Sequence, residues 1–251
     1  AQNANGAMAP VVNRQTCKRG AVGDRNQALY EWNGAVDAMA KWDWPRLMLT
    51  QSFRFGPAVA VEANKWLTYL EADLRLSGLE SIGSEIVDEL PDPAAILCRT
   101  NMGVIDAALG KLAQGLQVHI PGGIGEAAEL AKAAGELRDY GTTTHPDLVA
   151  FSSWEEFTTF VNTDPDGEDF RVLVSLVNTY GTEQIMALKR DLTTNEDEAD
   201  VVVTTGHKSK GKEWPSVPIG ADFAPRESDP EAGDEPLFTR AAAMLAYVAV
   251  T

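Results

Sequence analysis

Cysteine and histidine are scarce in this sequence, which holds two cysteines, Cys17 and Cys98, and three histidines. Two cysteines do not form a disulfide framework. Cys98 lies in an apolar stretch, which is typical of a buried free thiol. The cysteines and histidines are dispersed and show none of the spacings of a metal site, so the sequence predicts none.

Long apolar runs are also missing, and basic residues are few. No run approaches the roughly 18 residues of a bilayer span, and the first residues lack the basic-then-apolar pattern of a signal peptide. We therefore expect a non-secreted, cytoplasmic protein without a membrane partner, in a bacterial or phage type of context. The 251 residues include 21 basic and 37 acidic side chains, for a net charge of −16. That acidity argues against a protein that coats nucleic acid, but it leaves room for a small basic groove.

Short apolar runs alternate with helical patterns, which predicts an α/β fold with a mostly parallel sheet. The predicted strands are 20–22, 47–49, 96–98, 118–120, 201–203 and 217–219. The predicted helices are 57–71, 102–114 and 124–137. Between about 139 and 198, three helical patterns follow one another without a strand, which predicts a small helical insertion. These patterns cover 152–161, 170–180 and 183–192.

A first polar cluster, GDRNQALYEWNGA, occupies residues 23–35. It places Asp24 and Gln27 at the carboxyl end of a predicted strand, where open α/β sheets bind ligands. An alternative interpretation makes Asp24 a helix N-cap, with Tyr30 and Trp32 as packing residues.

A second cluster, LTQSFRFGP, occupies residues 49–57 and again joins a strand to a helix. Its Arg54 could reach a phosphate through two parallel hydrogen bonds. The alternative is an ordinary surface arginine near a helix start.

A third cluster, TTGHKSKGKEW at 204–214, is a basic spot in an acidic chain. Residues 206–212 spell most of a phosphate-binding P-loop. However, Glu213 stands where Ser or Thr should bind Mg²⁺, and Trp214–Pro215 discourages the helix that should follow. We therefore reject a P-loop here.

Taken in order, the three clusters resemble motifs III, IV and V of the UvrD/Rep-type superfamily 1 DNA helicases. Residues 95–101, AILCRTN, match the strand between motifs IV and V of that family. Residues 1–2 resemble the end of motif II, and residues 247–251, YVAVT, resemble the start of motif VI. The residues of motif V and the small helical insertion most resemble those of the compact, F-box-helicase-like branch.

The resemblance implies two RecA-like motor domains. Residues 1–45 would be the C-terminal part of the first, and residues 46–251 would be the second, with its helical insertion at about 139–198. The chain would be a fragment from the end of motif II to the start of motif VI, with motif I and the Mg²⁺ ligands upstream. The implied activity is ATP-dependent 3′–5′ translocation and DNA unwinding, as in DNA repair, with this fragment inactive alone.

The resemblance also assigns a nucleotide site. Gln27 would sense the γ-phosphate of ATP, and Arg54 would contact it and stabilise charge in the transition state. Gly211 and Glu213 would bind the nucleotide, with Glu213 hydrogen-bonded to the ribose. The motor interpretation requires Gln27, Arg54 and Glu213 to surround one cleft.

The same resemblance implies contacts with single-stranded DNA and with its junction with duplex. Trp32 would stack on a base, as sequence-tolerant DNA-binding proteins do. The residues expected at the strand are Tyr30, Trp32, Thr205, His207, Lys208 and Lys210. Asn33 departs from the family, which usually has arginine there.

Two alternatives stay open. The chain could be a non-catalytic nucleic-acid-binding or interaction module derived from a helicase. It could also be an unrelated acidic α/β protein, although five ordered partial motifs argue against chance. Flanking coding sequence with G-x-x-x-x-G-K-[ST] and D-E upstream, and an arginine downstream, would favour the motor.

Overall fold

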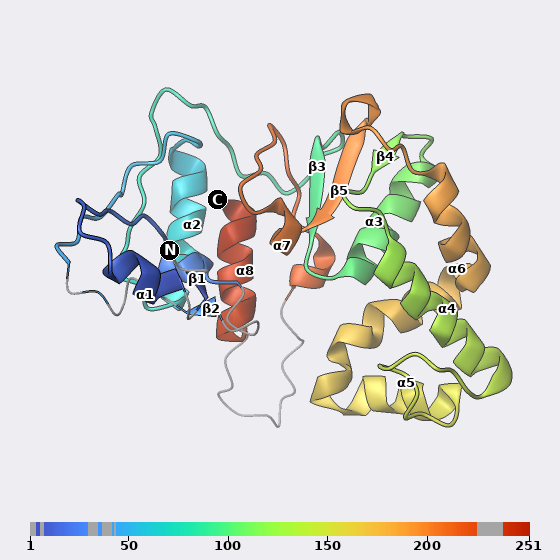
Figure 1. Cartoon of the computed structure of the whole chain (residues 1–251). Coiled ribbons are helices and arrows are strands. Elements are labelled where there is room, and N and C mark those ends of the chain that lie inside the picture. Colours follow the sequence, from blue (N-terminus) through green and yellow to red (C-terminus); the bar gives the residue numbers. More distant parts are fainter. Residues whose placement is uncertain (1–3, 6–7, 30–34, 37–41, 43, 225–237) are drawn as a thin grey trace. The chain divides into compact units, whose positions relative to one another are not determined.

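The structure is a computed structural model that describes residues 4–5, 8–29, 35–36, 42, 44–224 and 238–251. The chain forms two compact units, one of residues 1–89 with 225–251 and one of residues 90–224 (Figure 1). Each unit is described by itself below. The boundary predicted at residue 45 lies inside the first unit, and the assignment of domains that goes with it stays a prediction.

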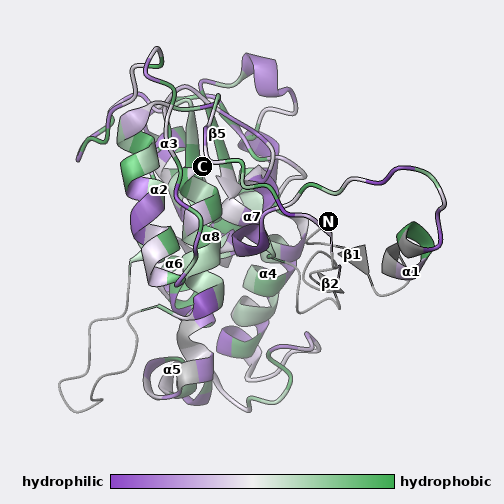
Figure 2. Cartoon of the chain, turned by 90° about the vertical axis from the view of Figure 1, so that its left-hand side faces the viewer, coloured by the Kyte–Doolittle hydropathy of each residue, from purple (hydrophilic) through white to green (hydrophobic). Residues whose placement is uncertain are grey.

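The first unit is built mainly from helices. A short antiparallel pair joins β1 (Ala4–Asn5) to β2 (Ala35–Val36). The helical segments are α1 (Met8–Asn13), the 3-10 turn η1 (Arg25–Gln27), α2 (Pro57–Tyr69) and α8 (Arg240–Val250). Helix α2 begins at a proline, whose missing N–H has no helical partner at that position anyway. It packs against α8, which is hydrophobic along most of its length (Figure 2).

Two strands predicted in this unit are wrong. Residues 20–22 and 47–49 form no strand, and Val22 and Leu47 are 76% and 91% exposed. An apolar run becomes a strand only where a neighbouring backbone accepts and donates its hydrogen bonds. The nearest such pairing begins just after Leu49, where Ser52 and Thr50 exchange main-chain bonds of 2.8 Å with Ser77.

A three-stranded parallel sheet lies in the second unit. Its strands are β3 (Ala95–Cys98), β4 (Val118–His119) and β5 (Val201–Thr205), in the order β3-β5-β4. These three strands were predicted, and the central strand β5 is buried along its whole length, as expected in a parallel sheet. The predicted edge strand at 217–219 is only a bridge from Ile219 to Leu97, because Pro218 has no N–H to pair.

The helices of the second unit follow the predicted periodicity closely. They are α3 (Asn101–Ala113), α4 (Gly125–Tyr140), α5 (Trp154–Thr163), α6 (Arg171–Asp191) and the short α7 (Gly206–Ser209). Three 3-10 turns join them, η4 (Pro165–Phe170), η5 (Glu196–Glu198) and η6 (Ala221–Phe223). Gly181, at φ 72° and ψ 162°, interrupts α6 between the two helical patterns that the sequence predicted.

One hydrophobic core joins the sheet to all the long helices of this unit. Helix α3 packs on the strands, and α6 packs on α3 and α4. Fully buried side chains come from each layer, among them Ile105, Leu137, Phe157, Leu173 and Val203. The unit is therefore a mixed α/β fold with a small parallel sheet. Among the described residues, no helix is both long and apolar enough to cross a bilayer.

Candidate functional site

Asp24 caps η1, which was the alternative interpretation of the first cluster. Its Oδ1 atom accepts hydrogen bonds from the main-chain nitrogen of Asn26 at 2.9 Å and from the Asn26 amide at 3.1 Å. The cap leaves the second carboxylate oxygen available for a more distant partner.

That partner is Tyr247 on α8. Its hydroxyl donates to Oδ2 of Asp24 at 2.8 Å, and Gln27 hydrogen-bonds to the same hydroxyl. Burial raises the pKa of Tyr247, and the charge of Asp24 raises it further, while the Gln27 bond opposes both. The tyrosine is therefore a permanent donor that fastens the first cluster to α8.

Arg54 also reaches α8. Its Nη1 atom donates to the main-chain oxygen of Thr251 at 3.0 Å. The Thr251 hydroxyl in turn donates to the main-chain oxygen of Tyr247 at 2.8 Å. The two predicted catalytic residues, Gln27 and Arg54, thus lie at the same end of one helix. Their roles toward ATP stay predictions.

The third cluster begins at the carboxyl end of the central strand β5. Thr205 is buried, and its hydroxyl caps α7 by accepting from the main-chain nitrogen of Lys208 at 3.3 Å. Burial lowers the pKa of His207 below 6.5, so the imidazole is neutral at neutral pH. Any contact of His207 with a phosphate would therefore be a hydrogen bond rather than an ion pair.

Lys208 extends from this loop toward the end of β4. It is exposed, and a Cβ added to Gly122 would lie 3.8 Å from its ammonium nitrogen. Gly122 and Gly123 both have positive φ, 80° and 69°, a conformation that glycine adopts at no steric cost. The loops after β4 and β5 therefore meet at one edge of the sheet, with a lysine between them.

The second half of the loop agrees with the rejection of a P-loop. Gly211 has φ 87°, and the residues from Lys212 to Ile219 form no helix. Glu213 is exposed and belongs to the second unit, whereas Gln27 and Arg54 belong to the first. The convergence of all three around one cleft stays a prediction. Tyr30 and Trp32, like Asn33, lie outside the described residues.

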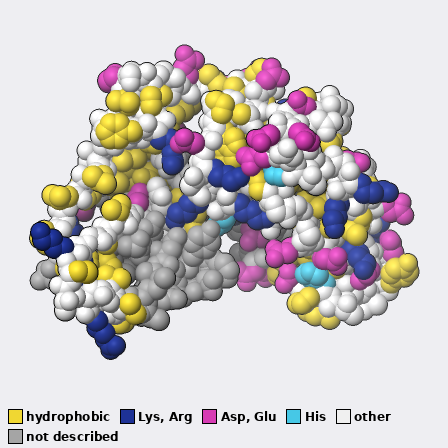
Figure 3. All heavy atoms as spheres, turned by 45° about the horizontal axis from the view of Figure 1, so that its top comes forward, with side chains coloured by type: hydrophobic (Ala, Val, Ile, Leu, Met, Phe, Trp, Pro, Cys, Tyr) yellow, Lys and Arg dark blue, Asp and Glu magenta, His cyan; other side chains and the backbone are white. Residues whose placement is uncertain are grey.

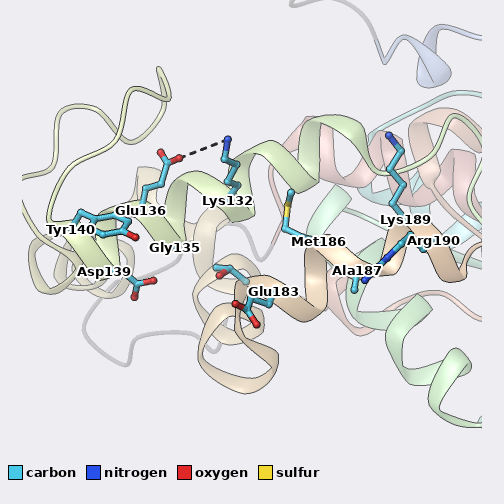
Figure 4. Close-up of a pocket in the computed structure, with 11 residues that line it drawn as sticks. Lys132, Gly135, Glu136, Asp139, Tyr140, Glu183, Met186, Ala187, Lys189 and Arg190 are labelled. Atoms are coloured by element: carbon cyan, nitrogen blue, oxygen red, sulfur yellow. Dashed lines mark ion pairs between the residues drawn. The ribbon is translucent and has the colours of Figure 1, made fainter.

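Two hollows do not contain the predicted nucleotide residues. One, of about 590 Å³, lies between α4 and α6 and carries charges of both signs, including the Lys132–Glu136 pair (Figure 4). The other, of about 440 Å³ in the first unit, is lined in part by Asp24 and by the stacked rings of Trp42 and Trp44. Neither hollow is lined by Gln27 or Arg54.

Sequence reasoning missed Asp222, which organises the end of β3. Its carboxylate accepts from the main-chain nitrogens of Arg99 and Thr100 at 2.9 and 2.8 Å and from the Thr100 hydroxyl at 3.0 Å. Thr100 is the N-cap of α3. Burial, then the charges of Asp222 and Asp106, raise the pKa of the Cys98 thiol to about 12. Cys98 is therefore the buried, unreactive thiol that its apolar surroundings predicted.

Basic side chains occur in small groups on the surface. On the face shown in Figure 3, Lys and Arg side chains stand among many Asp and Glu side chains. The loop after β5, with Lys208, Lys210 and Lys212, is such a group in the second unit.

Comparison with known proteins gives two relatives over nearly the whole chain. "F-box DNA helicase protein 1" of Schizosaccharomyces pombe is 28% identical over an alignment of 253 positions, which covers 90% of this chain and 29% of that protein. "F-box DNA helicase 1" of Gallus gallus is 26% identical over an alignment of 247 positions, which covers 89% of this chain and 24% of that protein. The chain is helicase-like. This similarity confirms the resemblance to helicases that the ordered motifs predicted.

The helicase-like chain spans less than a third of the length of these curated relatives, 29% of one and 24% of the other. No family model matches it. The relatives are eukaryotic, and they do not support the bacterial or phage context that we expected.

Proposed function

We propose that this chain is part of an ATP-dependent DNA helicase of the UvrD/Rep-type superfamily 1, in which ATP hydrolysis drives 3′–5′ movement along single-stranded DNA. The similarity to two F-box DNA helicases over about 90% of the chain is the observation that carries the proposal. Residues 1–45 would belong to the first RecA-like motor domain and residues 46–251 to the second. A role in DNA repair and action at a junction of single-stranded and duplex DNA belong to the same proposal.

The loop after β5 is the proposed strand-binding surface of the second unit. Lys208 is exposed beside Gly122, which follows β4, and Lys210 lies two residues further along the loop. Parallel α/β sheets bind their ligands at the carboxyl ends of the strands. Lysines at such an edge can neutralise successive phosphates without requiring a base sequence.

The first unit is proposed to contribute to the nucleotide site. Arg54 is an exposed guanidinium at the end of α8, and Gln27 contacts the same helix through Tyr247. An arginine and an amide fit the oxygens of a terminal phosphate. When bound, ATP would supply the phosphoryl group whose transfer to water releases energy. A movement of α8 would then displace both Arg54 and Gln27, because each of them contacts this helix.

Magnesium is proposed to be held by another part of the polypeptide. Among the described residues, no three His, Cys, Asp or Glu side chains form a cluster suited to a metal ion. Because the resemblance places motif I and the Mg²⁺ ligands outside these residues, we expect this chain alone neither to hydrolyse ATP, measured as phosphate release with and without single-stranded DNA, nor to unwind duplex DNA, measured by strand displacement. Steady-state hydrolysis that Arg54→Ala abolishes would contradict this expectation.

Single-strand binding tests the proposal directly. We expect the chain to bind a fluorescein-labelled oligodeoxythymidine, and Lys208→Ala with Lys210→Ala to weaken binding by about 25-fold at 0.1 M salt. The slope of log affinity against log salt should fall by about 1.4, because each phosphate contact contributes about 0.7. Fluorescence anisotropy across a salt series measures both quantities.

A matched control removes two lysines elsewhere. Lys65 and Lys132 lie on α2 and α4, and the Lys65→Ala, Lys132→Ala variant changes the net charge equally. It should leave the slope unchanged. Equal losses in both double variants would mean that general charge, rather than this loop, governs binding, and would favour the non-catalytic alternative or an unrelated protein.

A further inference from the structure

Among the described residues, Lys212 forms an ion pair, unlike Lys208 of the same loop. Its Nζ atom lies 3.0 Å from Oε2 of Glu196, and both side chains are about two-fifths exposed. The same ammonium lies 5.7 Å from the centre of the Trp214 ring, within the range of a cation–π contact. Lys212 therefore contacts two neighbours, the Glu196 carboxylate and the Trp214 ring.

Glu196 is the centre of this arrangement. The hydrogen bond from Lys212 lowers the pKa of Glu196 most, and partial desolvation opposes it. The charge of Lys212, a hydrogen bond with the Trp214 side chain and the charge of His119 lower the pKa further. The carboxylate therefore stays ionised and holds two side chains of the same loop at once.

The segment that carries Glu196 is itself fixed to the sheet. Asn195 caps η5 by accepting from the main-chain nitrogen of Asp197 at 3.1 Å. The main-chain nitrogen of Thr193 donates to Val118 of β4 at 3.0 Å. A contact with Glu196 thus ties the loop after β5 to the β4 side of the sheet.

Lys208 has a different environment. The described part of the chain contains no ion pair between Lys208 and an acid, and its nearest feature is Gly122. An exposed lysine beside glycines can approach a phosphate closely, whereas a lysine held by a carboxylate must first give up that partner.

We infer that Lys212 is a positioning residue for single-strand binding: paired with Glu196 and Trp214, it holds the loop so that Lys208 faces the DNA, and it neutralises no phosphate itself. This inference rests on the proposed function.

The test compares four variants of the chain by anisotropy with labelled oligodeoxythymidine across a salt series. Lys208→Gln should lower the salt slope by about 0.7. Lys212→Gln should leave the slope unchanged and weaken binding about two- to fivefold, the range for an exposed pair. Glu196→Gln should weaken binding to a similar degree, although it removes a negative charge. The Glu196→Lys, Lys212→Glu exchange should restore affinity to within about twofold of the natural chain.

Long-range charge alone predicts the opposite sign for Glu196→Gln, since removing a carboxylate should tighten binding to DNA. Tighter binding by Glu196→Gln, or a fall in slope with Lys212→Gln as large as with Lys208→Gln, would overturn the inference. The Glu62–Lys65 pair on α2 is a matched control, and Glu62→Gln or Lys65→Gln should change neither affinity nor slope.

Hydrogen exchange separates failure of the inference from failure of the proposed function. In the absence of DNA, Lys212→Gln and Glu196→Gln should each speed exchange of the main-chain amide of residue 212, which donates to the main-chain oxygen of Ser209 at 2.8 Å. Unchanged exchange in both variants overturns the positioning role. If the natural chain binds no single-stranded DNA while amide exchange responds as expected, the proposed function is wrong. In that case the contact of Lys212 with Glu196 and Trp214 still positions the loop.

Discussion

Replacing Phe157 by alanine is expected to destabilise the second unit by about 3–5 kcal/mol. The side chain is fully buried, and its ring contacts those of Phe151, Trp154 and Phe170 at centroid distances of 5.1, 5.5 and 5.6 Å. Truncation leaves a cavity and removes all three ring contacts, two of which join α5 to Phe151 and Phe170 outside the helix. Urea unfolding followed by circular dichroism measures the loss as a lower midpoint.

Tyr140→Ala is the matched control, because this aromatic side chain is 79% exposed. It should change stability by no more than about 0.5 kcal/mol. A Phe157→Ala loss below about 1 kcal/mol would contradict the packing of α5.

The Phe157→Ala result would show whether the helical stretch at 139–198 is a separate insertion or part of the core of the second unit. The sequence predicts a small insertion, and the three helical patterns do form helices. In the structure their buried side chains share one core with α3, α4 and the sheet. We therefore expect the stretch to unfold together with the sheet in a single transition.

The parts of the fold that the sequence predicts correctly depend on local patterns. Helices α2, α3 and α4 follow from apolar periodicity, and the interruption of α6 follows from Gly181, which has no Cβ to oppose a positive φ. Strands β3 and β5 were found because their predicted parts, 96–98 and 201–203, are apolar throughout, as buried parallel strands are. The failures at 20–22 and 47–49 have the same appearance in sequence, because strand pairing depends on distant residues.

In the candidate site, too, local contacts could be predicted from the sequence and long-range contacts could not. The N-caps of Asp24 and Thr205 lie within three residues of their partners, so local reasoning can reach them. The bond from Tyr247 to Asp24 spans 223 positions, and no pattern near either residue predicts it. Glu196 is one acid among several in an acidic stretch, and only the fold brings it to Lys212.

Asp222 is the largest omission, because the main-chain groups that it accepts from lie more than 120 positions away in the sequence. It follows a predicted strand, and two glycines, Gly103 and Gly220, surround it. A Cβ on either glycine would collide with the Asp222 carboxylate. The carboxylate occupies the first turn of α3, where a negative charge is favourable. It thereby stabilises the turn that joins β3 to α3.

Gly103→Ala is expected to cost about 2–3 kcal/mol in the natural chain and almost nothing in an Asp222→Ala background. The new Cβ would overlap Oδ2 of Asp222 and lie 2.8 Å from its Cγ. Expelling the carboxylate leaves the main-chain nitrogens of Arg99 and Thr100 without their acceptor, at about 1–3 kcal/mol for each buried donor. Without Asp222, the remaining neighbour is the Cβ of Cys98 at 3.2 Å, which a small shift relieves.

Urea unfolding of the four chains in this cycle should give a coupling of about 2 kcal/mol, which is typical of residues in direct contact. Gly110→Ala provides the control on the same helix, since a Cβ there meets nothing within 4 Å. It should stabilise the chain by about 0.5–1 kcal/mol, because alanine favours a helix over glycine. Additive losses from Gly103→Ala and Asp222→Ala would show that the glycine is kept for a reason other than the carboxylate. A coupling near the expected value would make Gly103 and Asp222 one structural unit, in which the absence of a side chain at one position permits the cap formed by the other.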